Sequence, residues 1–92
     1  MVSFDRLPGG TLIAAGLRDL QEGRESEASL LVLVGAPRLR RLGVAIPSTA
    51  LTDAEHRLYE GLARVDPDGA HSRYNALIRT LVSFERAAEC AG

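Results

Sequence analysis

The sequence predicts an all-α fold, a compact single-domain bundle of four main helices plus one short helical turn over residues 1–92. Three observations predict it. Apolar residues recur at helical spacing in three long segments. Only one short apolar run resembles a strand, and it has no second strand to pair with. Short breaks containing glycine or proline separate the segments. The expected helices cover residues 11–22, 27–35, 38–42, 53–65 and 70–89.

The composition is typical of a small folded protein. Of its 92 residues, 46% are hydrophobic and 25% are charged, a balance unlike that of a disordered chain. The net charge of −1 provides no overall attraction to nucleic acid or to an anionic membrane. Lysine is absent, which excludes a lysine nucleophile or Schiff base.

Targeting and redox features favour a cytoplasmic protein. The single cysteine, Cys90, cannot form a disulfide within the chain, so a secreted disulfide scaffold is not expected. Residues 1–5 lack the charged and then apolar pattern of a signal peptide. The longest apolar runs fall far short of the ~20 residues that span a bilayer, and we expect no membrane association.

The first helix, residues 11–22, follows the break at Pro8-Gly9-Gly10 and carries one apolar stripe. Gly16 lies inside this stripe, where it lowers helix propensity by about 1 kcal/mol relative to alanine. Its missing side chain would let a second helix approach closely. Gly23 is the residue expected to end the helix. The stripe consists of Leu12, Ile13, Gly16, Leu17 and Leu20.

The second helix, residues 27–35, is predicted to start at the N-cap Ser26. Residues 30–34 are apolar on every side, so periodicity alone does not separate a buried helix from a buried strand. We interpret the segment as helix because a lone strand leaves its backbone hydrogen bonds unmade. Such a helix lies at the centre of the core, or buries its second face on another subunit.

Two further helices follow. Pro37 suits the first turn of the short helix 38–42, which a glycine ends. The helix 53–65 is predicted from a capping box, with Thr52 as N-cap and Glu55 at the third helical position. Its expected core stripe is Ala54, Leu58, Leu62 and Val65.

The last helix, residues 70–89, contains one carboxylate within its apolar stripe. Glu85 falls among apolar residues, where a buried carboxylate must be paired or protonated. An arginine from elsewhere or a tyrosine hydroxyl would meet it; alternatively, the helix end projects beyond the core and Glu85 is solvated. The stripe is Tyr74, Leu77, Ile78, Leu81, Phe84 and Ala88.

The two histidines do not predict a metal site. In an antiparallel hairpin, His71 lies beside the end of the preceding helix, whereas His56 is about nine residues back, or roughly 14 Å. Metal–nitrogen bonds are about 2 Å long, so the two histidines cannot share an ion. We expect no metal and no other cofactor.

Arg64 and His71 flank the loop between the last two helices, and Arg73 follows closely. The spacing of Arg64 and His71 resembles the Arg-(four to six residues)-His signature of HEPN-type helical ribonucleases. The resemblance implies that the two side chains assist cleavage at an RNA phosphate, commonly across a dimer interface. The plainer interpretation, which we prefer, is a surface arginine and a histidine in the first turn of its helix.

The only basic cluster consists of Arg38, Arg40 and Arg41. One interpretation is that these side chains contact an anion or an acidic partner. Such clusters are more often the solvated side of a short helix, and this one lacks the interleaved aromatic residues typical of single-strand binding. Nucleic-acid binding is therefore disfavoured.

No assembled catalytic set is recognisable in the sequence. We therefore expect a non-catalytic protein–protein interaction module that self-associates, with a dimer favoured and a second protein as a further possible partner. The alternative is a HEPN-like ribonuclease or nucleotide-processing subunit that uses Arg64 and His71.

Overall fold

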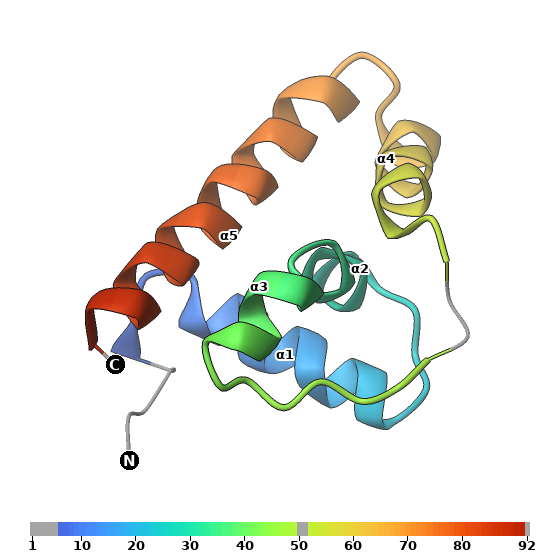
Figure 1. The fold of residues 1–92 in the computed structure, drawn as a ribbon. Coiled ribbons are helices and arrows are strands. Elements are labelled where there is room, and N and C mark those ends of the chain that lie inside the picture. Colours follow the sequence, from blue (N-terminus) through green and yellow to red (C-terminus); the bar gives the residue numbers. More distant parts are fainter. Residues whose placement is uncertain (1–5, 50–51, 92) are drawn as a thin grey trace.

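The computed structural model describes residues 6–49 and 52–91. These residues form five α-helices and no strand, which confirms the all-α bundle (Figure 1). The helix ends differ from the expected ones by no more than two residues. The helices are α1 (Gly10–Gln21), α2 (Glu27–Val34), α3 (Ala36–Arg41), α4 (Ala54–Val65) and α5 (Ala70–Ala91).

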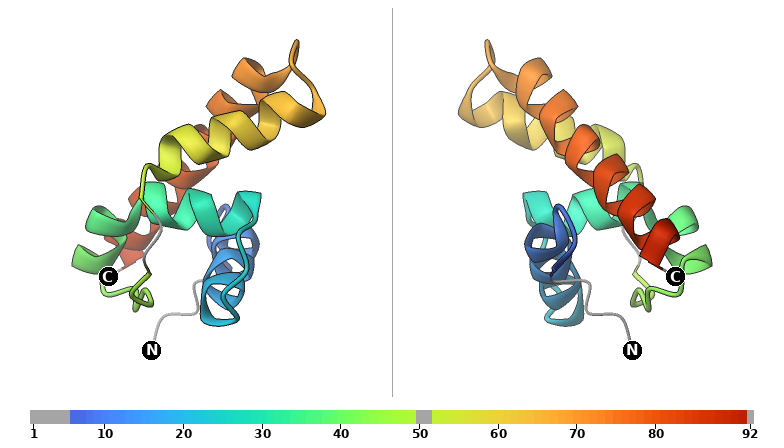
Figure 2. Two further views of the ribbon diagram at one scale, coloured as in Figure 1. Left: turned by 90° about the vertical axis from the view of Figure 1, so that its right-hand side faces the viewer. Right: turned by 90° about the vertical axis from the view of Figure 1, so that its left-hand side faces the viewer.

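Helix α2 is the centre of the molecule. It packs against each of the other four helices, with α1 crossing it on one side and the antiparallel α4–α5 hairpin on the other (Figure 2). Leu31 and Val32 are fully buried, and Leu30 is 5% exposed. Leu33 and Val34, however, are only half-buried. The apolar segment is therefore a core helix whose last two apolar residues the described part of the chain buries only in part.

Gly16 allows α1 to approach α2 closely, as expected. A Cβ atom at Gly16 would collide with the backbone carbonyl oxygen of Ala28 and would lie 2.6 Å from Cγ2 of Val32. The helix propensity that glycine sacrifices here is offset by the contact between the two backbones.

Ser26 caps α2, which confirms that prediction. The Ser29 backbone N–H donates to Ser26 Oγ at 3.1 Å, and the Ser26 backbone N–H donates to Ser29 Oγ at 2.7 Å, a reciprocal capping box. The Ser26 hydroxyl also donates to Oδ2 of Asp19 at 2.6 Å. This one serine therefore fixes both the start of α2 and its position relative to the end of α1.

The capping box predicted for α4 is wrong. The N-cap is Asp53, which has a left-handed φ of 54°, and no side chain caps the helix. An N-cap side chain reaches the first turn from an extended backbone, so the left-handed Asp53 leaves Thr52 outside the helix. The Thr52 carbonyl instead accepts a 3.0 Å bond from Arg57 Nε.

Val65, predicted as a core residue of α4, is 84% exposed. It is the last residue of the helix, and the tip of the α4–α5 hairpin extends beyond the N-terminal start of α2 (Figure 2). Leu58 and Leu62, which lie over α2, are buried as expected. The apolar stripe of a helix can continue to its last residue even where no neighbouring helix is left to cover it.

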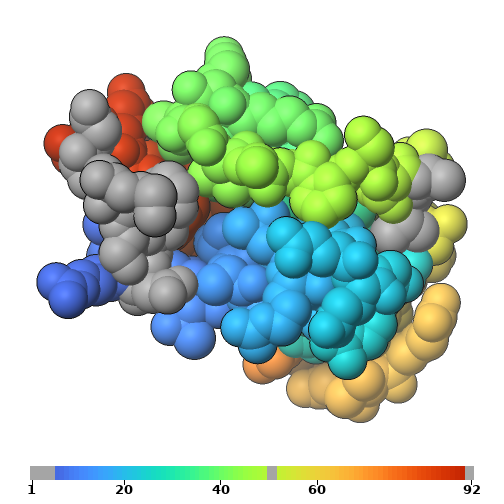
Figure 3. All heavy atoms as spheres, turned by 90° about the horizontal axis from the view of Figure 1, so that it is seen from below, coloured from blue at the N-terminus to red at the C-terminus, as the bar shows by residue number. Residues whose placement is uncertain are grey.

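The last parts of the fold are the α2–α3 junction and the connector after α3, residues 44–49. A Cβ on Gly35 would lie 2.8 Å from Cδ1 of Leu81, so the junction abuts α5. Gly43, with φ of 94°, ends α3, and the next residue, Val44, is buried. The connector then runs over the face of the molecule that α1 also occupies (Figure 3).

Candidate functional site

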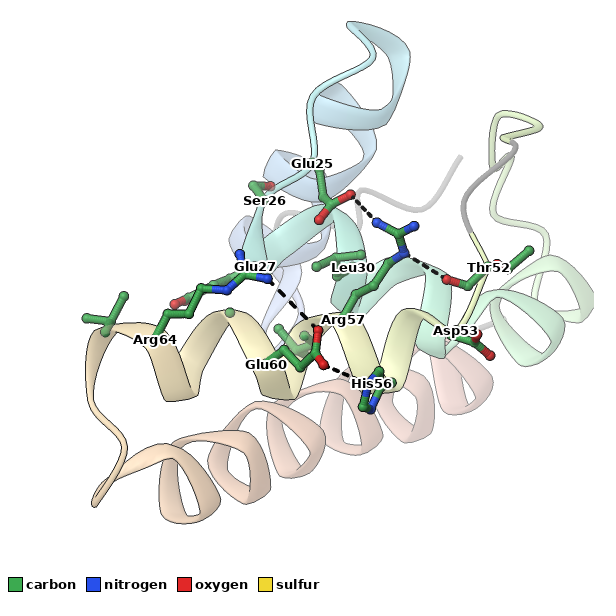
Figure 4. A pocket seen from close by; sticks show the side chains of 13 residues that line it. Glu25, Ser26, Glu27, Leu30, Thr52, Asp53, His56, Arg57, Glu60 and Arg64 are labelled. Atoms are coloured by element: carbon green, nitrogen blue, oxygen red, sulfur yellow. Dashed lines mark hydrogen bonds and ion pairs between the residues drawn. The ribbon is translucent and has the colours of Figure 1, made fainter.

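A charged pocket of about 580 Å³ lies between α4 and the start of α2 (Figure 4). Arg57 crosses it and donates to Glu25 at 3.1 Å. On α4, Glu60 accepts from His56 at 2.8 Å and lies 3.9 Å from Arg64. These pairs are solvent-exposed, so each contributes no more than about 1 kcal/mol to stability. Both arginines of the pocket thus already face a carboxylate.

The structure places Arg64 and Arg73 near the start of α2, but it does not connect them to His71. Arg64 lines the charged pocket, and Arg73 donates to Glu27 of α2 at 3.0 Å. His71 is exposed and has no hydrogen bond or ion pair within residues 6–49 and 52–91. His71 and Arg73 are two positions apart on α5, about 200° around the helix, so they point to different sides.

This arrangement offers little acid–base chemistry. A ribonuclease site needs a histidine and a cation directed at the same phosphate. Here Arg64 and Arg73 face carboxylates, and His71 lies outside the charged pocket, whose one histidine, His56, is paired with Glu60. In the part of the chain that the structure describes, no group of three or more His, Cys, Asp or Glu side chains is positioned to hold a metal ion.

The basic cluster on α3 divides into two parts. Arg38 donates to Glu89 of α5 at 2.8 Å, so it ties the short helix to the long one. Arg40 and Arg41 are exposed, and neither forms an ion pair with any of the described residues. Two arginines of the three thus remain available to a partner.

Glu85 is 5% exposed, on the face of α5 that meets the α2–α3 junction. A Cβ on Gly35 would lie 3.3 Å from its Oε2 atom, so the junction glycine gives this carboxylate its space. Burial raises the pKa of Glu85 above its ordinary value, and the positive charge of Arg38 lowers it in part. Arg38 acts on Glu85 through its charge, while its guanidinium group is hydrogen-bonded to Glu89.

The sequence did not predict a groove, lined by both apolar and polar residues, on the face formed by α2, α3, α4 and α5. It consists of two adjoining pockets, of about 630 and 400 Å³, which share Leu33, Pro37 and Ala54 among their lining residues. Figure 1 shows the four helices that frame it. We call it the tyrosine groove. Its apolar and aromatic lining comprises Leu33, Val34, Ala36, Pro37, Ala54, Tyr59 and Tyr74.

Two aromatic rings form one wall of the tyrosine groove. Tyr59 of α4 and Tyr74 of α5 meet edge to face, with ring centroids 5.8 Å apart and an interplanar angle of 66°. Tyr59 is 39% exposed although it is a large apolar residue. Burial and the nearby charge of Glu55 raise the pKa of Tyr74. The sequence signal for this groove was the apolar excess of α2, whose outward end, Leu33 and Val34, lines it.

Comparisons with known proteins add no family to this description. No protein-family model, curated protein or solved structure matches the chain. Among the described helices, none is both long enough and apolar enough to cross a membrane.

Proposed function

We propose that this protein is a non-catalytic interaction module that binds a second copy of itself, and that it does so in the cytoplasm. The observation that carries the proposal is the incomplete covering of α2. Leu33 and Val34 remain partly exposed in the lining of the tyrosine groove, beside an exposed tyrosine. Apolar surface gathered in a groove is typical of protein–protein contacts.

The separation of the reactive side chains supports the same proposal. Arg64 and Arg73 face carboxylates, and His71 has no partner among residues 6–49 and 52–91. The proposed role needs none of the three as an acid, a base or a nucleophile.

Sedimentation equilibrium between about 1 and 100 μM protein tests the proposal. We expect the weight-average mass to rise from that of one 9.9 kDa chain towards twice that value. A chain that stays monomeric at the highest concentration would contradict self-association.

A second assay addresses catalysis. We expect no cleavage of single-stranded RNA by the purified protein, and no difference between native protein and the His71→Ala variant. Cleavage that disappears in His71→Ala, while the circular dichroism spectrum stays native, would contradict a non-catalytic role and favour the ribonuclease alternative.

A further inference from the structure

We infer that the tyrosine groove is the dimer surface, and that two copies of the chain meet there antiparallel about a two-fold axis. This inference rests on the self-association proposed above and assigns it to one face. It also names the contacts at each end of the interface, an arginine of α3 against a carboxylate of α4.

The middle of the groove supplies the apolar contact. Leu33, Pro37 and Ala54 line both of its pockets, so the apolar floor is continuous from one pocket to the other. Tyr59 stands at one side with 39% of its surface exposed. Exposed tyrosines with an apolar body and a free hydroxyl are enriched at protein interfaces.

The two ends of the groove carry opposite charges. Arg40 lines only the smaller pocket, and Glu55 lines only the larger one. Both are exposed, and within the described residues neither has an ion pair. Asp53 borders both pockets, as Leu33, Pro37 and Ala54 do. The groove therefore has Arg40 at one end and Glu55 at the other, with Leu33, Pro37, Ala54 and Asp53 in the shared centre.

This charge pattern is self-complementary. In a two-fold dimer each surface meets its own copy turned end to end, and every contact occurs twice. Arg40 of one protomer then lies opposite Glu55 of the partner subunit, and Glu55 opposite the partner's Arg40. An unrelated partner would need its own cation, apolar centre and anion in the same order, whereas a second copy supplies all three.

The required area is within reach of so small a protein. A stable interface of ordinary size buries about 800 Å² on each partner. The chain exposes 5800 Å² in all, so the dimer would cover about one-seventh of its surface. Apolar burial at the centre supplies the affinity, while the paired charges fix the antiparallel register.

Charge exchange tests this arrangement by sedimentation equilibrium at low salt. Arg40→Glu places like charges at both ends of the interface, and we expect the dimer dissociation constant to rise at least about tenfold. Glu55→Arg should do the same. The double variant restores opposite charges in exchanged positions, and its dissociation constant should return to within about threefold of native. Arg86→Glu, at an exposed position outside the groove, is the matched control and should leave it unchanged.

Tyr59→Asp tests the apolar wall by the same measurement, with circular dichroism to verify folding. We expect at least about tenfold weaker association, because a charge replaces an aromatic side chain in the interface. Dimers unaffected by Tyr59→Asp and Arg40→Glu would overturn this surface while leaving self-association intact. Single variants that weaken the dimer without rescue in the double variant would overturn the antiparallel pairing. A native chain that is monomeric throughout would overturn both proposals.

Discussion

Individual residues in this protein are explained by the space around them more than by their intrinsic preferences. The helical glycines illustrate this point. Gly16 has the backbone of Ala28 against its missing side chain, whereas Gly61 of α4 has no atom within 4 Å of the position where a Cβ would lie. The sequence shows a glycine at both of these helical positions and does not show which of the two is packed.

Replacement of each glycine by alanine should therefore change stability in opposite directions. Gly16→Ala gains helix propensity but forces α1 and α2 apart, and we expect a net loss of about 1–3 kcal/mol. Gly61→Ala gains the same propensity without a clash and should stabilise the protein by up to about 1 kcal/mol. Urea unfolding of the two variants beside native protein measures both effects. An equally stable Gly16→Ala protein would contradict the close α1–α2 contact.

Glu85 provides a pH-dependent prediction. Because burial raises its pKa in the folded protein, the folded state binds the proton more tightly than the unfolded state does. Its contribution to stability is complete below the unfolded pKa, about 4.3, and is lost as the pH rises through the folded pKa. Glu85→Gln stays neutral at every pH, so it should be more stable than native protein at pH 7 and close to it at pH 4.

Thermal unfolding at the two pH values measures this difference. Glu89→Gln is the matched control, because it removes an exposed carboxylate from the same arginine, Arg38. It should lower stability at pH 7, by less than about 1 kcal/mol. A Glu85→Gln protein less stable than native at pH 7 would show that the ionised carboxylate is needed in the fold.

At the scale of the elements, the sequence predicted the helices well and their caps unevenly. Ser26 and Thr52 both precede a helix, and only Ser26 caps one. The difference lies in the backbone: Ser26 is extended, whereas the residue after Thr52 takes a left-handed turn. Side-chain identity predicts that a cap can form, but the path of the connector decides whether it does.

Alanine substitutions at these two positions test the difference. Ser26→Ala removes the cap of α2 together with the bond to Asp19, and we expect a loss of about 1–2 kcal/mol. Thr52→Ala removes an exposed side chain that caps nothing and should change stability by less than about 0.5 kcal/mol. The bond from Arg57 to the Thr52 backbone is retained in this variant. Equal losses at the two sites would contradict the observed start of α4.

The candidate site could be predicted only in part, because it depends on contacts between distant elements. Each apolar stripe indicated which face of a helix turns inward. The apolar residues on every side of α2 indicated either a central core position or a second contact with another subunit. Where the unburied apolar surface of α2 reaches the outside of the molecule depends on the placement of α3, α4 and α5. No local sequence pattern contains that placement. Likewise, the loop spacing placed Arg64 and His71 near each other in sequence, but in the structure Arg64 faces Glu60 of α4, and His71 has no ion pair among the described residues.

For the whole molecule, self-association and stability are linked. A ligand that binds only the folded state stabilises it, and in a dimer that ligand is the second copy. The unfolding temperature of native protein should therefore rise with protein concentration between about 1 and 100 μM. Arg40→Glu and Tyr59→Asp should flatten this dependence, and calorimetry at several concentrations measures it. An unfolding temperature independent of concentration would contradict a folded-state dimer in this range.

The central position of α2 has a consequence for how this protein opens. Helices α1, α3 and α4 pack mainly against this eight-residue helix, and α5 contacts both it and α4. The amide hydrogens of α2 should then exchange with solvent only when the whole chain unfolds, whereas those at the tip of the α4–α5 hairpin should exchange through local opening. Because the other helices all contact α2, we expect the loss of this helix to unfold the whole domain in one cooperative step.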